Sequence, residues 1–209
     1  NCSLLIAHCS QQKLEVMNYE LIIEIIAVAT GLLSVWYSKK INVLVFPIGI
    51  ISVLLYVFIF IKNGLFANAV INFIYFAISV FGWWNWKRQK SNDESLKSEE
   101  ELKVTTLNKK ESVIVSTIFL LSLFAISIFV PKSLSVRFDY FTSVLGLIAM
   151  WLTSIKKVEN WIFYLAADII LIPLCIYNEL YLTSVQYVAY TILAIMGYIN
   201  WNKEAKKNV

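Results

Sequence analysis

Charged residues are scarce in this chain of 209 residues. Asp, Glu, Lys and Arg make up 15% of it, whereas hydrophobic residues make up 59% and the mean hydropathy is +0.69. A soluble domain carries about 25% charged residues, because water must solvate its surface. Of the 18 basic and 14 acidic residues, 13 fall in the single segment 87–111, so the rest of the chain cannot cover a water-facing surface. The composition therefore predicts an integral membrane protein.

Residues that bind metals or carry out catalysis are scarce too. His8 is the one histidine and precedes the first apolar stretch, which excludes a histidine-ligated metal or haem inside the membrane. Cys2, Cys9 and Cys175 form no disulfide or zinc framework. A membrane-embedded enzyme would need a nucleophile, a metal or paired acid and base groups, so the sequence predicts neither an enzyme nor a cofactor. The net charge of +4 lies in loops, where it indicates membrane topology and no nucleic-acid partner.

Seven stretches approach the roughly 20 mostly apolar residues that a membrane-spanning helix needs. They are 20–37, 43–61, 65–86, 112–130, 140–155, 160–178 and 180–200. Lys and Arg are distributed unequally between the two sides of these spans, with four on the side of the N-terminus and fourteen on the side of the C-terminus. Because positive charge is retained on the cytoplasmic side, we expect the N-terminus outside and the C-terminus in the cytoplasm.

The second half of the chain repeats the first without a gap when the sequence is shifted by 115 residues. The matched pairs are Gly31 with Gly146, Trp36 with Trp151, Asn63 with Asn178, Leu65 with Leu180, Tyr75 with Tyr190, Gly82 with Gly197, and Asn85-Trp86 with Asn200-Trp201. Trp and Gly at fixed spacing seldom match by chance, so the two halves are predicted to be duplicated three-helix units. Four crossings separate their first spans, so both units point the same way through the membrane. Transporters with such parallel repeats bind substrate between them.

The organisation that follows is an all-α membrane protein with a 3+1+3 arrangement of spans. In chain order we expect an N-terminal extension outside the membrane (1–19), the first three-helix repeat (20–86), a charged cytoplasmic linker (87–111), a linker helix (112–130), the second three-helix repeat (137–203) and a cytoplasmic tail (204–209). The apolar run Ser3–Ala7 is too short for a signal-peptide core, and Met17 stands just before the first span. We therefore leave residues 1–16 out of the expected fold.

Polar and aromatic side chains recur near the middle of three spans. Spacings of three and four residues place them on one face of each predicted helix. The candidate binding residues on these faces are Asn68, Asn72 and Tyr75 in the third span, Trp161, Tyr164 and Asp168 in the sixth, and Gln186 and Tyr190 in the seventh. The three faces are predicted to converge at one depth and to form a substrate site.

Asp168 is the strongest of these signals. A charged residue at the membrane centre costs about 2.5–3.5 kcal/mol on insertion scales, so it should face water or a partner, and no span interior supplies a Lys or Arg. Two interpretations stay open: Asp168 contacts a polar or cationic ligand, or it is protonated or hydroxyl-bonded and holds helices together. The amides could likewise bond helix to helix, and the tyrosines could either pack or stack on a flat cationic ring.

Several phrases of the sequence resemble the PnuC family of vitamin transporters. They are F-P-I-G-I-I-S (46–52), I-N-F-I-Y-F-A-I-S-V-F-G-W-W-N-W (71–86), N-W-I-F-Y-L-A-A-D (160–168), L-Y-L-T-S-V-Q-Y (180–187) and G-Y-I-N-W (197–201). The resemblance extends from about Tyr19 to Lys203. It implies a multi-pass protein of the bacterial inner (cytoplasmic) membrane, with a SWEET-like seven-helix fold and a homotrimeric assembly in the lipid bilayer.

The same resemblance implies uptake of nicotinamide riboside by facilitated diffusion, followed by phosphorylation in the cytosol. It carries over a ligand set of Asn72, Tyr75, Trp161, Asp168, Gln186 and Tyr190. Relatives carry thiamine or riboflavin, so the vitamin itself stays open. Nicotinamide riboside and thiamine are both small flat cations, for which aromatic walls, amides and one carboxylate are suited. Neutral riboflavin makes poorer use of Asp168.

Two other classes are weaker alternatives. A seven-helix receptor with retinal would need a lysine in a late span, and spans 160–178 and 180–200 contain none. The internal repeat also argues against a receptor. A SWEET-type carrier of a neutral sugar would need no carboxylate, so it leaves Asp168 unexplained.

Overall fold

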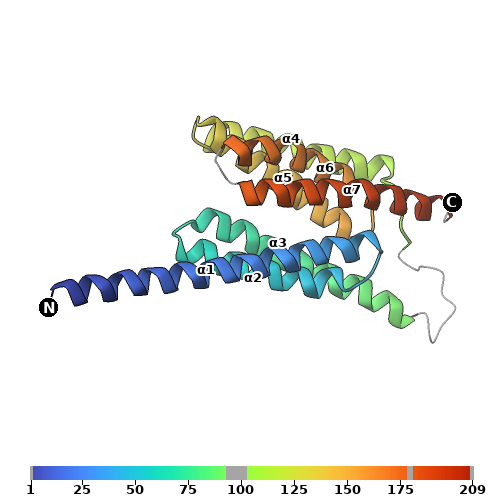
Figure 1. Cartoon of the computed structure of the whole chain (residues 1–209). Coiled ribbons are helices and arrows are strands. Elements are labelled where there is room, and N and C mark those ends of the chain that lie inside the picture. The colour runs from blue at the N-terminus through green and yellow to red at the C-terminus, as the bar shows by residue number, and fades with distance from the viewer. Residues whose placement is uncertain (1, 93–102, 178–180, 208–209) are drawn as a thin grey trace.

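The computed structural model describes residues 2–92, 103–177 and 181–207. Within these ranges the chain forms seven α-helices that run alternately up and down one bundle (Figure 1). They are α1 (Cys2–Lys39), α2 (Val45–Lys62), α3 (Phe66–Asn92), α4 (Lys109–Phe129), α5 (Leu134–Ser154), α6 (Asn160–Tyr177) and α7 (Tyr181–Lys207). The predicted all-α architecture of seven helices is confirmed. α1 is one continuous helix that includes the segment we set apart as an extension, and it projects beyond the other helices at its N-terminal end.

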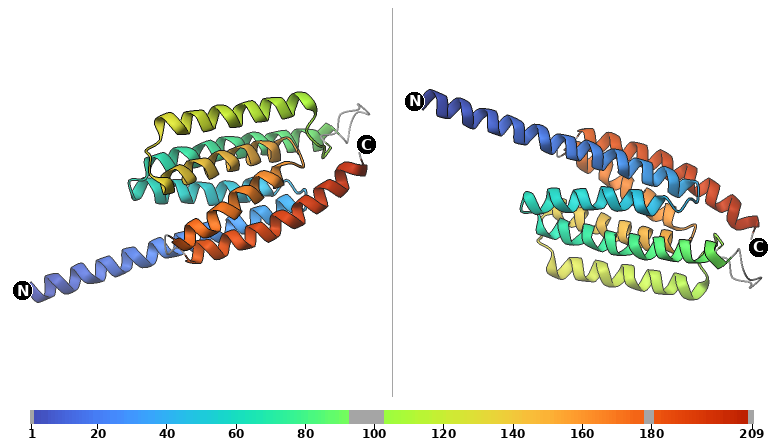
Figure 2. Two further views of the ribbon diagram at one scale, coloured as in Figure 1. Left: turned by 90° about the horizontal axis from the view of Figure 1, so that it is seen from above. Right: turned by 90° about the horizontal axis from the view of Figure 1, so that it is seen from below.

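Six of the helices form a closed ring. Each packs on the next in the order α1, α2, α3, α5, α6, α7, and α7 in turn packs on α1. α4 packs on α5 from outside this ring and lies at the edge of the bundle in both views of Figure 2. Helices α1, α3, α5 and α7 all finish at the same end of the ring, where α2, α4 and α6 begin. We call it the basic end, because Lys39, Lys40, Lys156 and Lys157 lie there.

The outside of the bundle is apolar, whereas part of its inside is polar. Large hydrophobic side chains on all seven helices are exposed, and the buried side chains include Ser52, Ser79, Thr142, Asp168 and Gln186. Water would favour the reverse arrangement, whereas lipid favours apolar groups outside and polar groups inside the bundle. The side-chain distribution therefore suits a helix bundle surrounded by lipid.

Among the described residues, five helical segments are long and apolar enough to cross a membrane by length and composition. They are Leu21–Lys39, Val45–Lys62, Phe66–Arg88, Lys109–Phe129 and Asn160–Tyr177. The other two helices, α5 and α7, carry buried polar side chains such as Thr142, Thr153 and Gln186. These side chains lower the apolar character of the two helices while pointing away from the surface.

The two three-helix repeats interlock. The third helix of each repeat packs on the first helix of the other, α3 on α5 and α7 on α1. Asn85 on α3 donates a hydrogen bond to the Ser154 carbonyl at 2.9 Å, and 115 residues further on, Asn200 on α7 donates to the Lys39 carbonyl at 2.8 Å. The repeat seen in the sequence is therefore a repeat of contacts between the two halves.

The turns that open α2 and α6 repeat as well. Ile41 and Lys156, again 115 residues apart, both adopt a left-handed backbone conformation with φ of 55°. Non-glycine residues seldom take this conformation, so its recurrence at matched positions shows that the two halves share a turn geometry, not only a helix pattern.

Four aromatic rings pack together at the basic end. This basic-end aromatic cluster consists of Phe46, Trp86, Trp161 and Trp201, with centroids 5.0 Å apart for Phe46–Trp86, 6.1 Å for Trp86–Trp201 and 5.7 Å for Trp161–Trp201. The indole N–H of Trp86 donates to the Ser154 carbonyl at 3.2 Å, and that of Trp201 donates to the Ser38 carbonyl at 2.9 Å. Both third helices are thereby fixed to the ends of α5 and α1.

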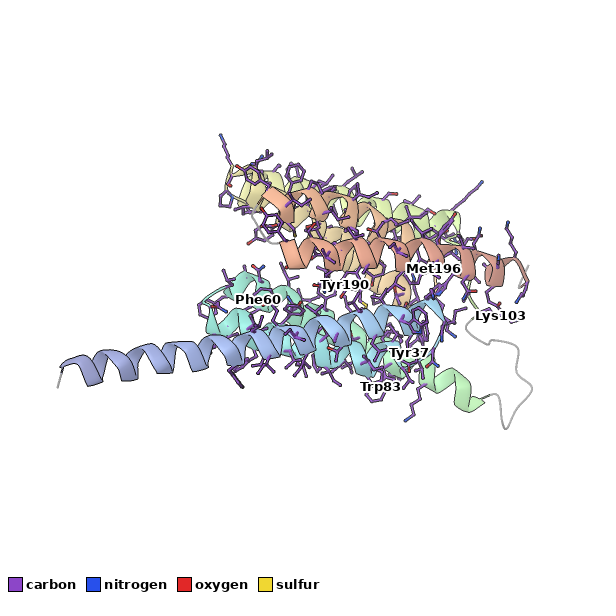
Figure 3. The ribbon with its side chains drawn as sticks, in the orientation of Figure 1. Tyr37, Phe60, Trp83, Lys103, Tyr190 and Met196 are labelled. Carbon is purple, nitrogen blue, oxygen red and sulfur yellow. The ribbon has the colours of Figure 1, made fainter. Side chains whose placement is uncertain are left out.

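The segment 103–108 lies across the turn between α5 and α6, and we call it the strap. Thr105 pairs with Lys157 in a short parallel bridge, with the Thr105 amide donating to the Lys156 carbonyl at 3.2 Å. Val104 is buried against the basic-end aromatic cluster. Figure 3 labels Lys103, where the strap begins, beside this end of the bundle. Of the expected linker 87–111, residues 87–92 therefore continue α3, and the strap is docked on the helix ring.

An ion pair and a capping box fix the far end of the strap. Lys157 pairs with Glu111 at 2.8 Å. Asn108 caps α4 by accepting from the Glu111 amide, while the Glu111 carboxylate accepts from the Asn108 amide. The Leu107 amide also donates to Glu159 at 2.9 Å. These bonds connect the start of α4 to the α5–α6 turn.

Candidate substrate-binding site

Tyrosines from four helices gather around one buried carboxylate. Asp168 on α6 lies near three of their hydroxyls, those of Tyr164, Tyr187 and Tyr190. Tyr75 on α3 lies close to Tyr164 and Tyr187, and Tyr56 on α2 lies close to Tyr187 and Tyr190. We call Asp168 and these five tyrosines the tyrosine–aspartate group. Both repeats contribute to it, α2 and α3 from the first and α6 and α7 from the second.

Two of the tyrosines occupy matched positions and cross between the repeats. The Tyr190 hydroxyl lies 2.6 Å from where a Cβ on Gly31 would stand, so α7 approaches α1 closely there. At the equivalent place in the other half, a Cβ on Gly146 would overlap the Tyr75 hydroxyl. That hydroxyl donates to the Ser143 carbonyl at 3.4 Å. Figure 3 labels Tyr190 on the side of α7 that faces α1. The absence of a side chain at both glycines is what lets the two phenols reach the opposite repeat.

Gln186 belongs to the same interior region. Its side chain is 9% exposed and its amide nitrogen donates to the Tyr190 hydroxyl at 2.9 Å. It also interacts with the hydroxyl of Tyr56 on α2. The amide therefore connects tyrosines of the first and second repeats, and it could exchange either bond for one to a ligand.

Asp168 is 6% exposed, and it forms no ion pair with any lysine or arginine that the structure describes. Burying a carboxylate away from a counter-charge is costly. The residue is therefore placed to attract a cation or a hydrogen-bond donor that enters the ring.

The two asparagines of α3 behave differently from the rest of the candidate set. Asn72 is half-buried and donates to the carbonyl of Asn68 on its own helix at 2.9 Å. Asn68 is exposed and lies one turn nearer the start of α3. The structure thus brings Tyr75, Tyr164, Asp168, Gln186 and Tyr190 together and leaves Asn68 at the surface, with Asn72 between them.

Trp161 joins the tyrosines to the basic-end aromatic cluster. Its side chain is fully buried, with its ring centroid 6.1 Å from that of Tyr164 and 5.7 Å from that of Trp201. The Tyr164 hydroxyl contacts the Met150 sulfur at 3.5 Å. Trp161 therefore lies where the interior of the ring meets its basic end.

Tyr56 and Tyr187 are part of the group, but sequence reasoning missed them. The internal repeat held a signal for Tyr187, because it stands 115 residues after Asn72, which was a candidate. Tyr56 follows the buried Ser52 by one helical turn. That signal is weak, because an apolar helix presents aromatic residues on every face.

The arrangement can bind a small ligand but offers little for chemistry. It combines flat phenol rings, one amide and one carboxylate, which suit stacking and hydrogen bonding to a flat polar or cationic molecule. In the residues 2–92, 103–177 and 181–207 there is no group of three or more His, Cys, Asp and Glu side chains that could hold a metal ion. A ring of lipid-facing helices, built from two parallel repeats around a polar interior, defines a membrane transporter.

The chain belongs to the nicotinamide mononucleotide transporter family, which matches residues 21–203. It is 25% identical over 212 residues to the nicotinamide riboside transporter PnuC of Escherichia coli (strain K12), covering 88% of this chain and 87% of that protein. It is also 25% identical over 191 residues to the nicotinamide riboside transporter PnuC of Neisseria mucosa, covering 88% of this chain and 73% of that one. The resemblance to the PnuC family is confirmed, and the family is one of transporters and not of enzymes.

The crystal structure of the vitamin B3 transporter PnuC has the same fold. It superposes with a TM-score of 0.72 at 22% sequence identity, and the match covers 99% of this chain and 91% of that chain. The prediction of a seven-helix, multi-pass membrane protein with a 3+1+3 arrangement is therefore confirmed.

Proposed function

We propose that the protein carries nicotinamide riboside across the bacterial inner membrane by facilitated diffusion. The observation that carries this proposal is the tyrosine–aspartate group, which both repeats build inside the ring. The pyridinium ring of nicotinamide riboside is a flat cation. Both the faces of tyrosine rings and a carboxylate attract such a cation. Its carboxamide and ribose hydroxyls can bond with Gln186. The relatives that are named as nicotinamide riboside transporters support the same substrate.

The charge of the interior favours the riboside over its phosphorylated form. Asp168 belongs to the tyrosine–aspartate group and Gln186 borders it. Within the described residues, no lysine or arginine is paired with either side chain. A phosphate would carry about −1.5 to −2 charges at neutral pH and would face a carboxylate without a basic partner. The riboside, which has no phosphate, fits this environment better.

We base facilitated diffusion on the small number of groups that could bind a coupling ion. A proton- or sodium-coupled carrier needs groups that bind the ion and the substrate together, and Asp168 is the one carboxylate of the tyrosine–aspartate group. Uptake should therefore be indifferent to collapse of the proton and sodium gradients once the substrate is trapped in the cytosol. Accumulation of unmodified riboside against its gradient would contradict this mechanism.

The orientation rests on the distribution of lysine and arginine. With fourteen of the 18 basic residues on one side, the basic end should face the cytoplasm and the N-terminus the outside. A reporter fused to the C-terminus or placed in the segment 87–111 should read cytoplasmic in intact cells. Labelling of that segment from outside would reverse the orientation.

The assembly is expected to be a homotrimer, as in the family that the sequence resembles. No residue of α4 is buried within one chain, and its side chains Leu120, Leu121 and Phe124 are more than 60% exposed. This helix is therefore free to face lipid or another copy. Native mass spectrometry of the protein in detergent distinguishes one, two and three copies.

Calorimetry on the purified protein tests the substrate. Nicotinamide riboside, nicotinamide mononucleotide, thiamine and riboflavin are titrated side by side. We expect heat from the riboside alone or with by far the highest affinity. Heat from thiamine alone would contradict nicotinamide riboside as the substrate but would leave the protein a vitamin transporter. The absence of heat from all four compounds would contradict the proposed binding site.

A further inference from the structure

The two repeats can be compared position by position, because each supplies a control for the other. Asn160 and Trp161 open α6, and the residues 115 positions earlier, Val45 and Phe46, open α2. All four are buried, Asn160 and Trp161 at 0% exposure, Val45 at 4% and Phe46 at 0%. Phe46 and Trp161 even pack on matched glycines, Gly82 and Gly197. The fold therefore accepts purely apolar side chains at this pair of positions.

The second repeat instead has hydrogen-bonding groups there, and they have no partners. Neither the amide nitrogen nor the amide oxygen of Asn160 forms a hydrogen bond within the described residues, and the indole N–H of Trp161 forms none either. Sealing such groups away from water without a partner is unfavourable. The other unpartnered buried side-chain atoms in the described part of the chain, on Ser38 and Glu159, lie at the same basic end.

Helix capping does not explain Asn160. An asparagine at the start of a helix commonly accepts a bond from an amide of the first turn. Here the amides of Ile162 and Phe163 donate to the Glu159 carbonyl at 3.0 and 3.4 Å, and the Trp161 amide donates to the Val158 carbonyl at 3.3 Å. The first turn is thus satisfied by backbone carbonyls, and the side-chain oxygen of Asn160 is left over.

Packing does not explain the Trp161 N–H either. The other two indoles of the basic-end aromatic cluster, Trp86 and Trp201, both donate to carbonyls at helix ends. Trp161 is the exception among the three, and its counterpart Phe46 has no N–H at all. Two neighbouring residues therefore depart from the repeat in the same way, each adding a polar group that the ring in this conformation does not use.

We propose that the Asn160 carboxamide and the Trp161 indole N–H form a selectivity site that hydrogen-bonds an amide or hydroxyl group of the substrate when the basic end of the ring opens. The site rests on the proposed function and extends it, because it adds Asn160 as a residue that selects the substrate. An asymmetric ligand inside a ring of two similar halves is oriented only where the halves differ. At positions 160 and 161 the side chains of the second repeat offer three N–H donors and one carbonyl acceptor, and those of the first offer none.

The test replaces Asn160 by the residue that the first repeat has in its place. Full-length wild type, Asn160→Val and Asn160→Leu are reconstituted in liposomes, and uptake of radiolabelled nicotinamide riboside is measured beside the midpoint of thermal unfolding. Leucine keeps the shape of the amide, so it controls for lost volume. We expect uptake to fall about 10-fold or more in both variants, while the unfolding midpoint stays or rises, because an unpartnered buried amide has been removed.

The reciprocal variant Val45→Asn is the matched control. It buries a new amide at the equivalent place of the first repeat, so it should lower the unfolding midpoint and leave the preference for the riboside over thiamine unchanged. Uptake within about twofold of wild type in Asn160→Val and Asn160→Leu overturns the selectivity site. Loss of uptake together with a lower midpoint in both variants assigns the amide to the fold and overturns it as well. A wild-type protein that takes up no riboside overturns the proposed function first, and the selectivity site with it.

Discussion

The Tyr75 hydroxyl of the first repeat lies against Gly146 of the second, in the space that a Cβ on that glycine would fill. The same relationship holds in reverse between Tyr190 and Gly31. These exchanged contacts join the halves beside the tyrosine–aspartate group, so the shape of the site depends on how closely the two repeats approach each other.

Gly146→Ala should therefore destabilise the protein and disturb the site together. The added methyl group overlaps the Tyr75 hydroxyl, and overpacking of this kind costs about 1–3 kcal/mol. Tyr75→Phe removes the overlapping oxygen, so the double variant should recover most of the lost stability. Thermal unfolding of the three variants in detergent measures this. A double variant no more stable than Gly146→Ala alone would contradict the contact.

Asp168→Asn should weaken binding of nicotinamide riboside without harming the fold. A neutral amide costs less to bury than a carboxylate, so the unfolding midpoint should stay or rise. Loss of a bond to a charged group costs about 1.5–3 kcal/mol, or roughly 10- to 150-fold in affinity. Calorimetry measures it, with Asp139→Asn as control, because Asp139 is an exposed carboxylate on α5. Unchanged affinity would contradict a contact between the Asp168 carboxylate and the riboside.

Gln186→Ala should weaken riboside binding roughly 5- to 150-fold, equivalent to about 1–3 kcal/mol for a lost amide contact. Its amide already bonds to Tyr190 and interacts with Tyr56, so the group is in place to be shared with a ligand. Asn72→Ala should have a similar effect if Asn72 exchanges its bond to the Asn68 carbonyl for one to the substrate. If Gln186→Ala weakens riboside binding as expected and Asn72→Ala does not, then Gln186 contacts the substrate and Asn72 does not.

Val104→Asp should release the strap from the ring. Val104 is 3% exposed against the basic-end aromatic cluster, and an unpaired carboxylate is unfavourable there. Trypsin should then cleave after Lys103 several times faster than in wild type. Mass spectrometry of the fragments over time measures this rate. Thr106→Asp is the matched control, because Thr106 lies in the strap but is exposed. Equal cleavage of the two variants would show that Val104 does not anchor the strap.

Much of the fold followed from the sequence alone, because a bilayer restricts what a chain can do. Seven apolar stretches predicted seven helices, since backbone groups in lipid must bond within a helix. The repeat at a shift of 115 residues predicted two parallel units, and matched pairs such as Tyr75 and Tyr190 have matched contacts in the structure. Helical spacing also placed Asp168, Gln186 and Tyr190 on faces that converge.

Other features were decided only by the tertiary structure. Helical periodicity gives the face of a helix but not its neighbour, so the sequence did not reveal that α3 packs on α5 and α7 on α1, which closes the ring. For the same reason it missed Tyr56, and it treated the segment 87–111 as a linker although Val104 is buried in the basic end. The unpartnered amide of Asn160 could not be read from the sequence at all, because whether a polar group finds a partner depends on atoms brought together from distant parts of the chain.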